Sequence, residues 1–228
     1  MSSYPYLLPH TVNTISQQRL IVCEGYSDAI FICELLKLNK ITNCAVGCPS
    51  REGGHGMGQS AIAQYLGAVR GSIDLKKANL THMLVVTDAD NDPEKQFKRI
   101  ADGLNKHRFT VPTKPFSVEG NAIKTGVFII PGDGRIGTLE NLLWDAAIKE
   151  RPSLKHCIAL LCWCTGGHIN NAPPNKKAKM KMSAIVAAHC VGNPWVSASG
   201  IWSDSGNPVP IDSTCFSHVS DFLLAFAS

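Results

Sequence analysis

The chain has 228 residues, a formal net charge of +4 and a pI of about 8.6. Hydrophobic residues make up 44% of it and charged residues 18%, which excludes an intrinsically disordered chain and predicts a packed core. The mildly basic balance permits contact with nucleic acid, but it lacks the dense basic stripe of dedicated nucleic-acid binders.

The nine cysteines indicate the compartment. Their number is odd, and several lie in apolar runs where a thiol acts as a small hydrophobe, so we expect reduced thiols in a cytoplasmic protein. The close pairs Cys44/Cys48 and Cys162/Cys164 lack the second pair or histidines that structural zinc needs. Residues 1–18 show no signal-peptide pattern, and no apolar run approaches the ~20 residues that span a bilayer, so no membrane contact is expected.

The first half of the chain alternates short apolar runs with segments of helical spacing. In chain order we expect a strand at 20–23, a helix capped by Ser27 or Asp28, a strand at 45–47, a helix at 59–69, a strand at 83–87 and a helix from Pro93 to about 107.

The second half starts the same way and then becomes helical. We expect a strand or hairpin near 116–118, a strand at 126–130, a helix capped by Thr138, helices at 153–164, 176–189 and 217–226, and loops at 170–175 and 192–210. This order predicts an α/β fold with a mainly parallel sheet and helices on both faces. Residues 1–18 form an N-terminal segment, 19–150 an α/β domain, and 151–228 a C-terminal helical extension packed on the same domain.

Carboxylates follow two of the expected strands. Glu24 comes after the first, and Asp88 and Asp90 come after the third. If those strands are neighbours, the three acids meet at the carboxyl edge of the sheet and attract a cation such as Mg²⁺ or Mn²⁺. Asp28 lies one helical turn beyond Glu24 and would help to hold a second ion. The alternative is an unrelated α/β protein in which these acids, and Asp92, cap helices.

Two segments carry a resemblance to a known family. Leu-Ile-Val-Cys-Glu-Gly-Tyr-Ser-Asp at 20–28 and Leu-Val-Val-Thr-Asp-Ala-Asp at 84–90 resemble the TOPRIM domain of topoisomerases, bacterial primases, recombination-repair proteins and the overcoming-lysogenisation-defect nucleases. The resemblance implies a Rossmann-like TOPRIM fold in which Glu24, Asp88 and Asp90 bind Mg²⁺ and act in catalysis.

Within that superfamily the chain is most similar to the lysogenisation-defect branch and to small stand-alone bacterial TOPRIM proteins. The shared features are Glu-Gly-x-x-Asp at 24–28, Gly-Thr-Leu-Glu at 137–140 and lysines near 177–179. They imply that Asp28 and Glu140 hold a second ion and that Lys179 neutralises charge on a phosphate.

The implied function is Mg²⁺-dependent phosphoryl transfer on DNA or RNA by a nuclease. The alternative is a non-catalytic metal- and phosphate-binding or regulatory module that works with a partner such as an ATPase. Both alternatives allow the protein to form a homo-oligomer.

Other segments allow two interpretations each. The glycine-rich loop at 53–58 would cradle phosphate, with His55 near substrate, or serve as a plain connection. The spacing around Trp144 and Trp163 favours core packing over base stacking. Four lysines near the C-terminal third would contact a phosphate backbone or form a solvated helix face: Lys176, Lys177, Lys179 and Lys181.

Overall fold

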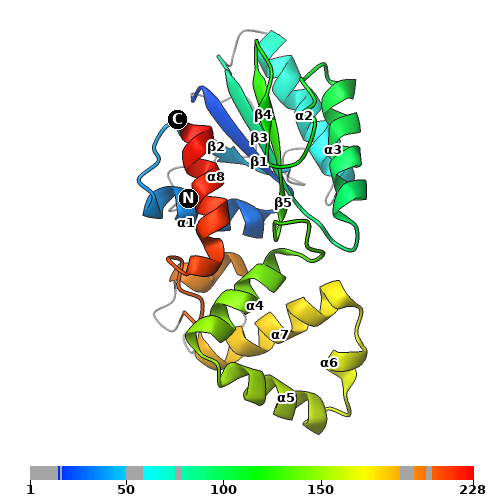
Figure 1. The fold of residues 1–228 in the computed structure, drawn as a ribbon, viewed down its shortest axis with the longest axis vertical. Coiled ribbons are helices and arrows are strands. Elements are labelled where there is room, and N and C mark those ends of the chain that lie inside the picture. Colours follow the sequence, from blue (N-terminus) through cyan, green and yellow to red (C-terminus); the bar gives the residue numbers. More distant parts are fainter. Residues whose placement is uncertain (1–14, 16, 50–58, 75–78, 191–197, 204–206) are drawn as a thin grey trace.

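The computed structural model describes residues 15, 17–49, 59–74, 79–190, 198–203 and 207–228, and it shows an α/β fold with one five-stranded sheet (Figure 1). The strands are β1 Arg19–Cys23, β2 Cys44–Gly47, β3 His82–Asp88, β4 Val118–Glu119 and β5 Lys124–Ile130. The α-helices are α1 Tyr26–Leu38, α2 Gln59–Asp74, α3 Pro93–Lys106, α4 Leu139–Glu150, α5 Leu154–Cys164, α6 His168–Asn171, α7 Pro174–His189 and α8 Ser217–Ala227. Two short 3₁₀ helices, η2 Ala198–Ser203 and η3 Thr214–Phe216, precede α8.

The sheet has the order β2-β1-β3-β5-β4, and every pair is parallel except β4 with β5. β1 and β3 are direct neighbours, with Cys23 opposite Val86. The carboxyl ends of these two strands therefore lie side by side, which confirms the expected mainly parallel sheet.

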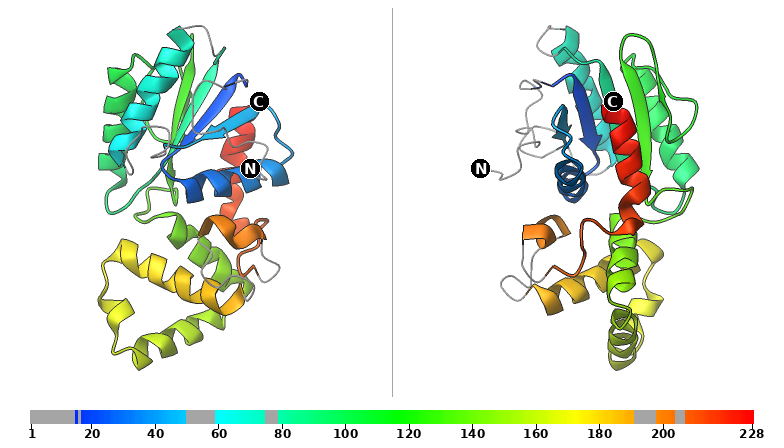
Figure 2. Two further views of the ribbon diagram at one scale, coloured as in Figure 1. Left: turned by 180° about the vertical axis from the view of Figure 1, so that it is seen from behind. Right: turned by 60° about the vertical axis from the view of Figure 1, so that its left-hand side comes forward.

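Alternate residues of each strand point to opposite faces, so the sheet carries a core on both sides. Ile21 packs in one core with residues of α1, α4 and α8, and Leu20 packs in the other with residues of α2 and α3. Figure 2 shows α1 and α8 on one face and α2 and α3 on the other. The expected helices on both faces are thus confirmed.

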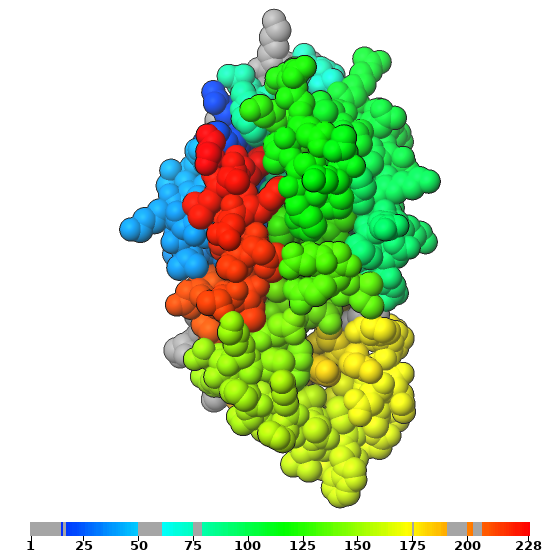
Figure 3. All heavy atoms as spheres, viewed as in Figure 1, coloured from blue at the N-terminus to red at the C-terminus, as the bar shows by residue number. Residues whose placement is uncertain are grey.

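Beyond β5 the chain leaves the sheet and then returns to it. α4 begins below the carboxyl edge of the sheet, α5 and α7 pack against α4, and α6 packs against α5 and α7. We call residues 151–190 the helical arm (Figures 1 and 3). α8 then runs back beside the sheet, where the Arg19 side chain donates a hydrogen bond to the Phe226 carbonyl at 3.2 Å.

Three local expectations are corrected. α1 begins at Tyr26, and its N-cap is the extended Gly25 in place of Ser27 or Asp28; the Asp28 carboxylate instead accepts the Gly25 N–H at 3.0 Å. The expected loop at 170–175 overlaps α6, because Gly166 and Gly167 adopt left-handed conformations that end α5 and turn the chain. Part of the expected loop at 192–210 is the 3₁₀ helix η2.

No helix in the described part of the chain is long and apolar enough to cross a membrane. All nine cysteines carry free thiols, as expected for reduced cysteines.

Candidate functional site

The ends of β1 and β3 bring Glu24 next to Asp88. The Glu24 N–H donates to the Val86 carbonyl at 3.0 Å, which extends the β1–β3 pairing by one residue. The Glu24 carboxylate then accepts a hydrogen bond from the Thr87 hydroxyl at 2.6 Å and a longer one from the Asp88 N–H at 3.4 Å. Thr87 is buried, so its hydroxyl holds Glu24 at the strand end.

Asp28 reaches the same edge from the first turn of α1. Its side chain is 7% exposed and folds back onto Gly25. Burial, and after it the charges of Glu24 and Glu140, raise the pKa of Asp28 to about 7. An ionised Asp28 is therefore costly here unless a positive charge lies close by.

Asp88 is the last residue of β3 and touches the start of α4. Its Oδ1 accepts the Leu139 N–H at 2.8 Å, an orphan donor of the first helical turn. Loss of solvent, and then the charges of Asp28, Glu24 and Glu140, raise the pKa of Asp88 well above its usual value. The hydrogen bond from Leu139 lowers the pKa of Asp88 and offsets part of this rise.

Glu140 completes the group from the first turn of α4. Its Oε2 accepts the Thr138 hydroxyl at 2.7 Å, and its Oε1 lies 4.0 Å from the Lys179 ammonium on α7. Lys179 is 59% exposed, and its charge lowers the pKa of Asp28. Glu24, Asp28, Asp88 and Glu140 are called the carboxylate cluster below, and Lys179 stands at its rim.

Asp90 lies at the same strand end but makes different contacts. Its backbone is left-handed at φ 50°, and its carbonyl accepts the Gly137 N–H at 2.7 Å. Its carboxylate accepts a hydrogen bond from Gln96 of α3 at 3.1 Å. The structure therefore brings Glu24 and Asp88 together, while it turns the Asp90 carboxylate toward α3.

The four carboxylates do not have the geometry of a preformed metal-binding site. In the described part of the chain, no group of three or more His, Cys, Asp or Glu side chains has the arrangement of a metal site. Each of the four carboxylates accepts a hydrogen bond from a protein donor: the Thr87 hydroxyl, the Gly25 N–H, the Leu139 N–H and the Thr138 hydroxyl.

Several contributors to the site escaped the sequence analysis. Thr87 and Thr138 hold carboxylates through their hydroxyls, and Asn141 accepts the Thr138 N–H at 2.9 Å. A threonine just before a strand-end aspartate is the signal that would have found the first. The glycine-rich loop at 53–58, with His55, lies outside the described residues.

Of the two tryptophans expected to pack in the core, Trp144 packs against it and Trp163 does not. Trp163 is 80% exposed at the end of α5, so the expectation was wrong there. Trp144 is partly buried and lies under the Lys181 ammonium, 4.9 Å from the centre of its ring. Both line a pocket beside the helical arm.

Comparison with known proteins gives one match. No curated protein and no solved structure matches the chain. The model of a family described as "Protein of unknown function (DUF3226)" matches residues 18–201. That span holds the whole carboxylate cluster, Asp90 and Lys179, and it ends before α8. Because the match covers most of the sequence, the chain belongs to the DUF3226 family.

Proposed function

We propose that this protein is a Mg²⁺-dependent phosphoryl-transfer enzyme that acts on nucleic acid, a nuclease of the TOPRIM type. The observation that carries the proposal is the carboxylate cluster at the carboxyl edge of a parallel sheet, where ligands gather in such folds. Its acids come from the end of β1, the first turn of α1, the end of β3 and the first turn of α4.

The chemistry of this cluster suits a hard divalent cation. Burial, and after it the charges of neighbouring carboxylates, raise the pKa of both Asp28 and Asp88, so the ionised cluster needs a nearby positive charge. Carboxylate oxygens are the donors that Mg²⁺ and Mn²⁺ prefer. Glu24, Asp28, Asp88 and Glu140 would hold such ions, with Asp90 available at the same strand end. A bound Mg²⁺ supplies Lewis-acid polarisation of a phosphoryl oxygen and lowers the pKa of water.

The protein's own groups would orient the phosphate and balance its charge. Lys179 presents an ammonium at the rim, beside Glu140, where it would meet a phosphate oxygen. The first turn of α4 directs the Leu139 N–H and the positive end of the helix dipole toward Asp88.

A second candidate is a metal- and phosphate-binding regulatory module without turnover, working with a partner protein. One observation favours it: every carboxylate of the cluster is occupied by a protein donor, and the arrangement is not that of a formed metal site. The two candidates share cation binding and differ in catalysis.

The test measures both properties on three proteins. Wild type, Asp88→Asn and the exposed control Asp102→Asn are titrated with Mn²⁺ by calorimetry and incubated with labelled DNA and RNA, single- and double-stranded, in Mg²⁺ or Mn²⁺. We expect wild type and Asp102→Asn to bind Mn²⁺ and cleave, and Asp88→Asn to lose about a hundredfold or more in cleavage rate.

Mn²⁺ binding without cleavage of any substrate would support the regulatory module instead. Absence of Mn²⁺ binding at millimolar concentration would overturn both candidates, and equal cleavage rates of wild type and Asp88→Asn would overturn the nuclease.

A further inference from the structure

The charges of the chain are unevenly distributed. Of the 22 Lys and Arg residues, six lie in the helical arm, and none of the 18 Asp and Glu residues lies there. The six are Arg151, Lys155, Lys176, Lys177, Lys179 and Lys181. The modest net charge of +4 therefore conceals an arm of +6 attached to a remainder of −2. An acid-free basic surface of this kind attracts polyanions.

The same arm exposes large apolar side chains. Leu160 is 60% exposed on α5, and Trp163 is 80% exposed near its C-terminal end. An indole left in solvent beside lysines offers a flat face on which an unstacked base can lie. The arm thus combines a cationic surface with an aromatic one.

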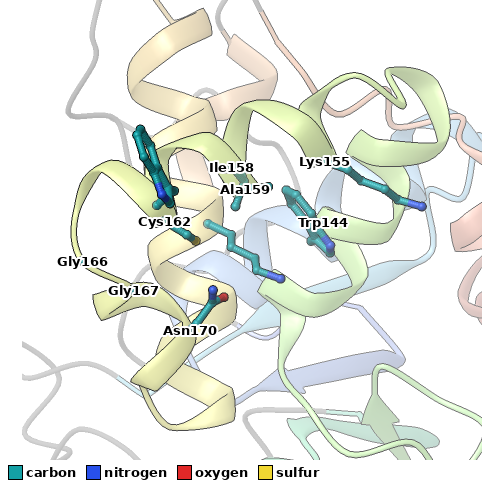
Figure 4. Close-up of a pocket in the computed structure, with 10 residues that line it drawn as sticks. Trp144, Lys155, Ile158, Ala159, Cys162, Gly166, Gly167 and Asn170 are labelled. Carbon is teal, nitrogen blue, oxygen red and sulfur yellow. The ribbon is translucent and has the colours of Figure 1, made fainter.

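A pocket of about 790 Å³ opens between α4 and the three helices of the arm (Figure 4). Ile158 and Ala159 form part of its apolar wall, Trp144 and Trp163 contribute indoles, and Lys181 contributes an ammonium. Asn170 of α6 points toward the same space, where its amide can meet the polar edge of a base (Figure 4). The volume lies within the range of small-ligand sites.

The pocket lies next to the carboxylate cluster. Trp144 follows Glu140 by one helical turn on α4, a rise of about 6 Å. α7 borders both features, since the Lys179 ammonium lies 4.0 Å from Glu140 and the Lys181 ammonium lies 4.9 Å from the centre of the Trp144 ring. A strand held in the pocket would therefore carry a neighbouring phosphate toward the cluster.

We propose that the helical arm binds single-stranded nucleic acid, with one base in the pocket against Trp144 and Trp163 and the backbone phosphates on the lysines. This proposal deepens the proposed function by naming the form of nucleic acid that binds. Binding to the arm does not depend on the proposed phosphoryl transfer; only the reaction of the phosphate at the carboxylate cluster does. In a duplex the base faces are stacked on one another, so the phosphates can still contact the lysines but no base face is free to stack on the indoles. We therefore expect weaker binding of duplex than of single strands.

The charge of the arm also argues against a second copy of this chain as the occupant. In a two-fold symmetric dimer the same patch meets itself. Two acid-free arms would then face each other with like charge, which opposes association.

Binding is measured without divalent ions, so that catalysis plays no part. Fluorescence anisotropy follows a labelled 12-mer oligothymidylate in EDTA with wild type, Trp163→Ala, Trp163→Phe and the exposed control Lys98→Gln on α3. We expect Trp163→Ala to weaken binding about tenfold, and Trp163→Phe to retain most of the affinity because the phenyl ring still stacks. Lys98→Gln should bind as wild type does.

A salt titration tests the lysines separately. The double variant Lys155→Gln with Lys181→Gln should make the negative slope of log affinity against log salt shallower by about 1.4, since each phosphate contact on a single strand contributes about −0.7.

Any of the following binding results would overturn the inference: no oligonucleotide binding by wild type, unchanged affinity in Trp163→Ala, equal affinity for duplex, or equal competition by thymidine monophosphate. Tighter binding to anionic lipid vesicles, or a dimer that Trp163→Ala abolishes, would assign the surface to another partner and overturn it as well. Binding is measured without divalent ions, whereas the proposed cleavage requires them. Binding without cleavage by wild type would therefore contradict the proposed nuclease and leave this inference standing.

Discussion

Asp28 is an acid placed where its ionised form is costly. Its pKa lies at about 7 in the folded protein, against an ordinary value of 3.8, because it is buried beside Glu24 and Glu140. The folded state therefore holds the proton more tightly than the unfolded chain does. The stability that this group contributes is complete below about pH 4 and is lost as the pH rises through 7.

Asp28→Asn removes that loss and keeps an oxygen acceptor for the Gly25 N–H. We expect the variant to be more stable than wild type by about 1–2 kcal/mol at pH 8 in EDTA, and nearly equal to it at pH 4.5. Urea denaturation at both pH values measures the difference, with Asp102→Asn as the exposed control. A gain of the same size at both pH values would show that the charge of Asp28 is not its cause.

Single residues also show where sequence reasoning succeeds and where it stops. Glu24 and Asp88 were placed together because both follow apolar runs that were expected to be strands, and β1 pairs directly with β3. The direction of the Asp90 side chain could not be predicted from the sequence. It depends on a hydrogen bond from Gln96 of α3 and on a backbone hydrogen bond from Gly137, which lies far along the chain.

At the scale of the secondary-structure elements, the connection from β3 to α3 needs a residue that tolerates a left-handed backbone. Asp90 has φ 50°, a left-handed conformation that aspartate and asparagine tolerate and β-branched residues do not. Its carbonyl accepts the Gly137 N–H, which ties this connection to the segment that leads into α4. The Asp92 carboxylate then accepts the Lys95 N–H and caps α3.

Two substitutions at Asp90 test this connection. Asp90→Asn retains an oxygen for Gln96 and tolerates the left-handed turn, whereas Asp90→Val must strain the backbone. We expect Asp90→Val to be less stable than Asp90→Asn by about 1–2 kcal/mol in urea denaturation with EDTA present. Equal stability of the two variants would mean that the turn relaxes without cost.

Helices and strands were predictable from apolar spacing, but their surroundings were not. The pattern around Trp163 indicates an apolar helix face, and periodicity alone does not say whether another element covers that face. α5 packs on α4 and α7 through Leu154, Ile158 and Cys162, while Leu160 and Trp163 stay exposed. The proposed nucleic-acid surface includes these two exposed side chains, which the sequence pattern alone did not show to be exposed.

At the scale of the whole molecule, the last helix closes the fold. The family match ends at residue 201, yet α8 returns to the sheet after the helical arm and packs between α1 and β5. Phe222 lies 5.3 Å from Phe128 of β5 between ring centres, and Phe216 lies 5.1 Å from Phe31 of α1. The position of α1, and with it Asp28, thus depends on a segment that follows the arm.

Two adjacent leucines in α8 test this dependence. Leu223 is 1% exposed and Leu224 is 43% exposed, so the same substitution probes the inner and outer faces of one helix. We expect Leu223→Ala to lower the free energy of unfolding by about 2–4 kcal/mol, because it leaves a cavity against the sheet, and Leu224→Ala to change it by less than about 0.5 kcal/mol. Both values come from urea denaturation followed by circular dichroism. If α8 were a loosely attached appendage, the two variants would unfold at the same urea concentration as wild type, and the orientation of α1 would have to be set by the sheet alone.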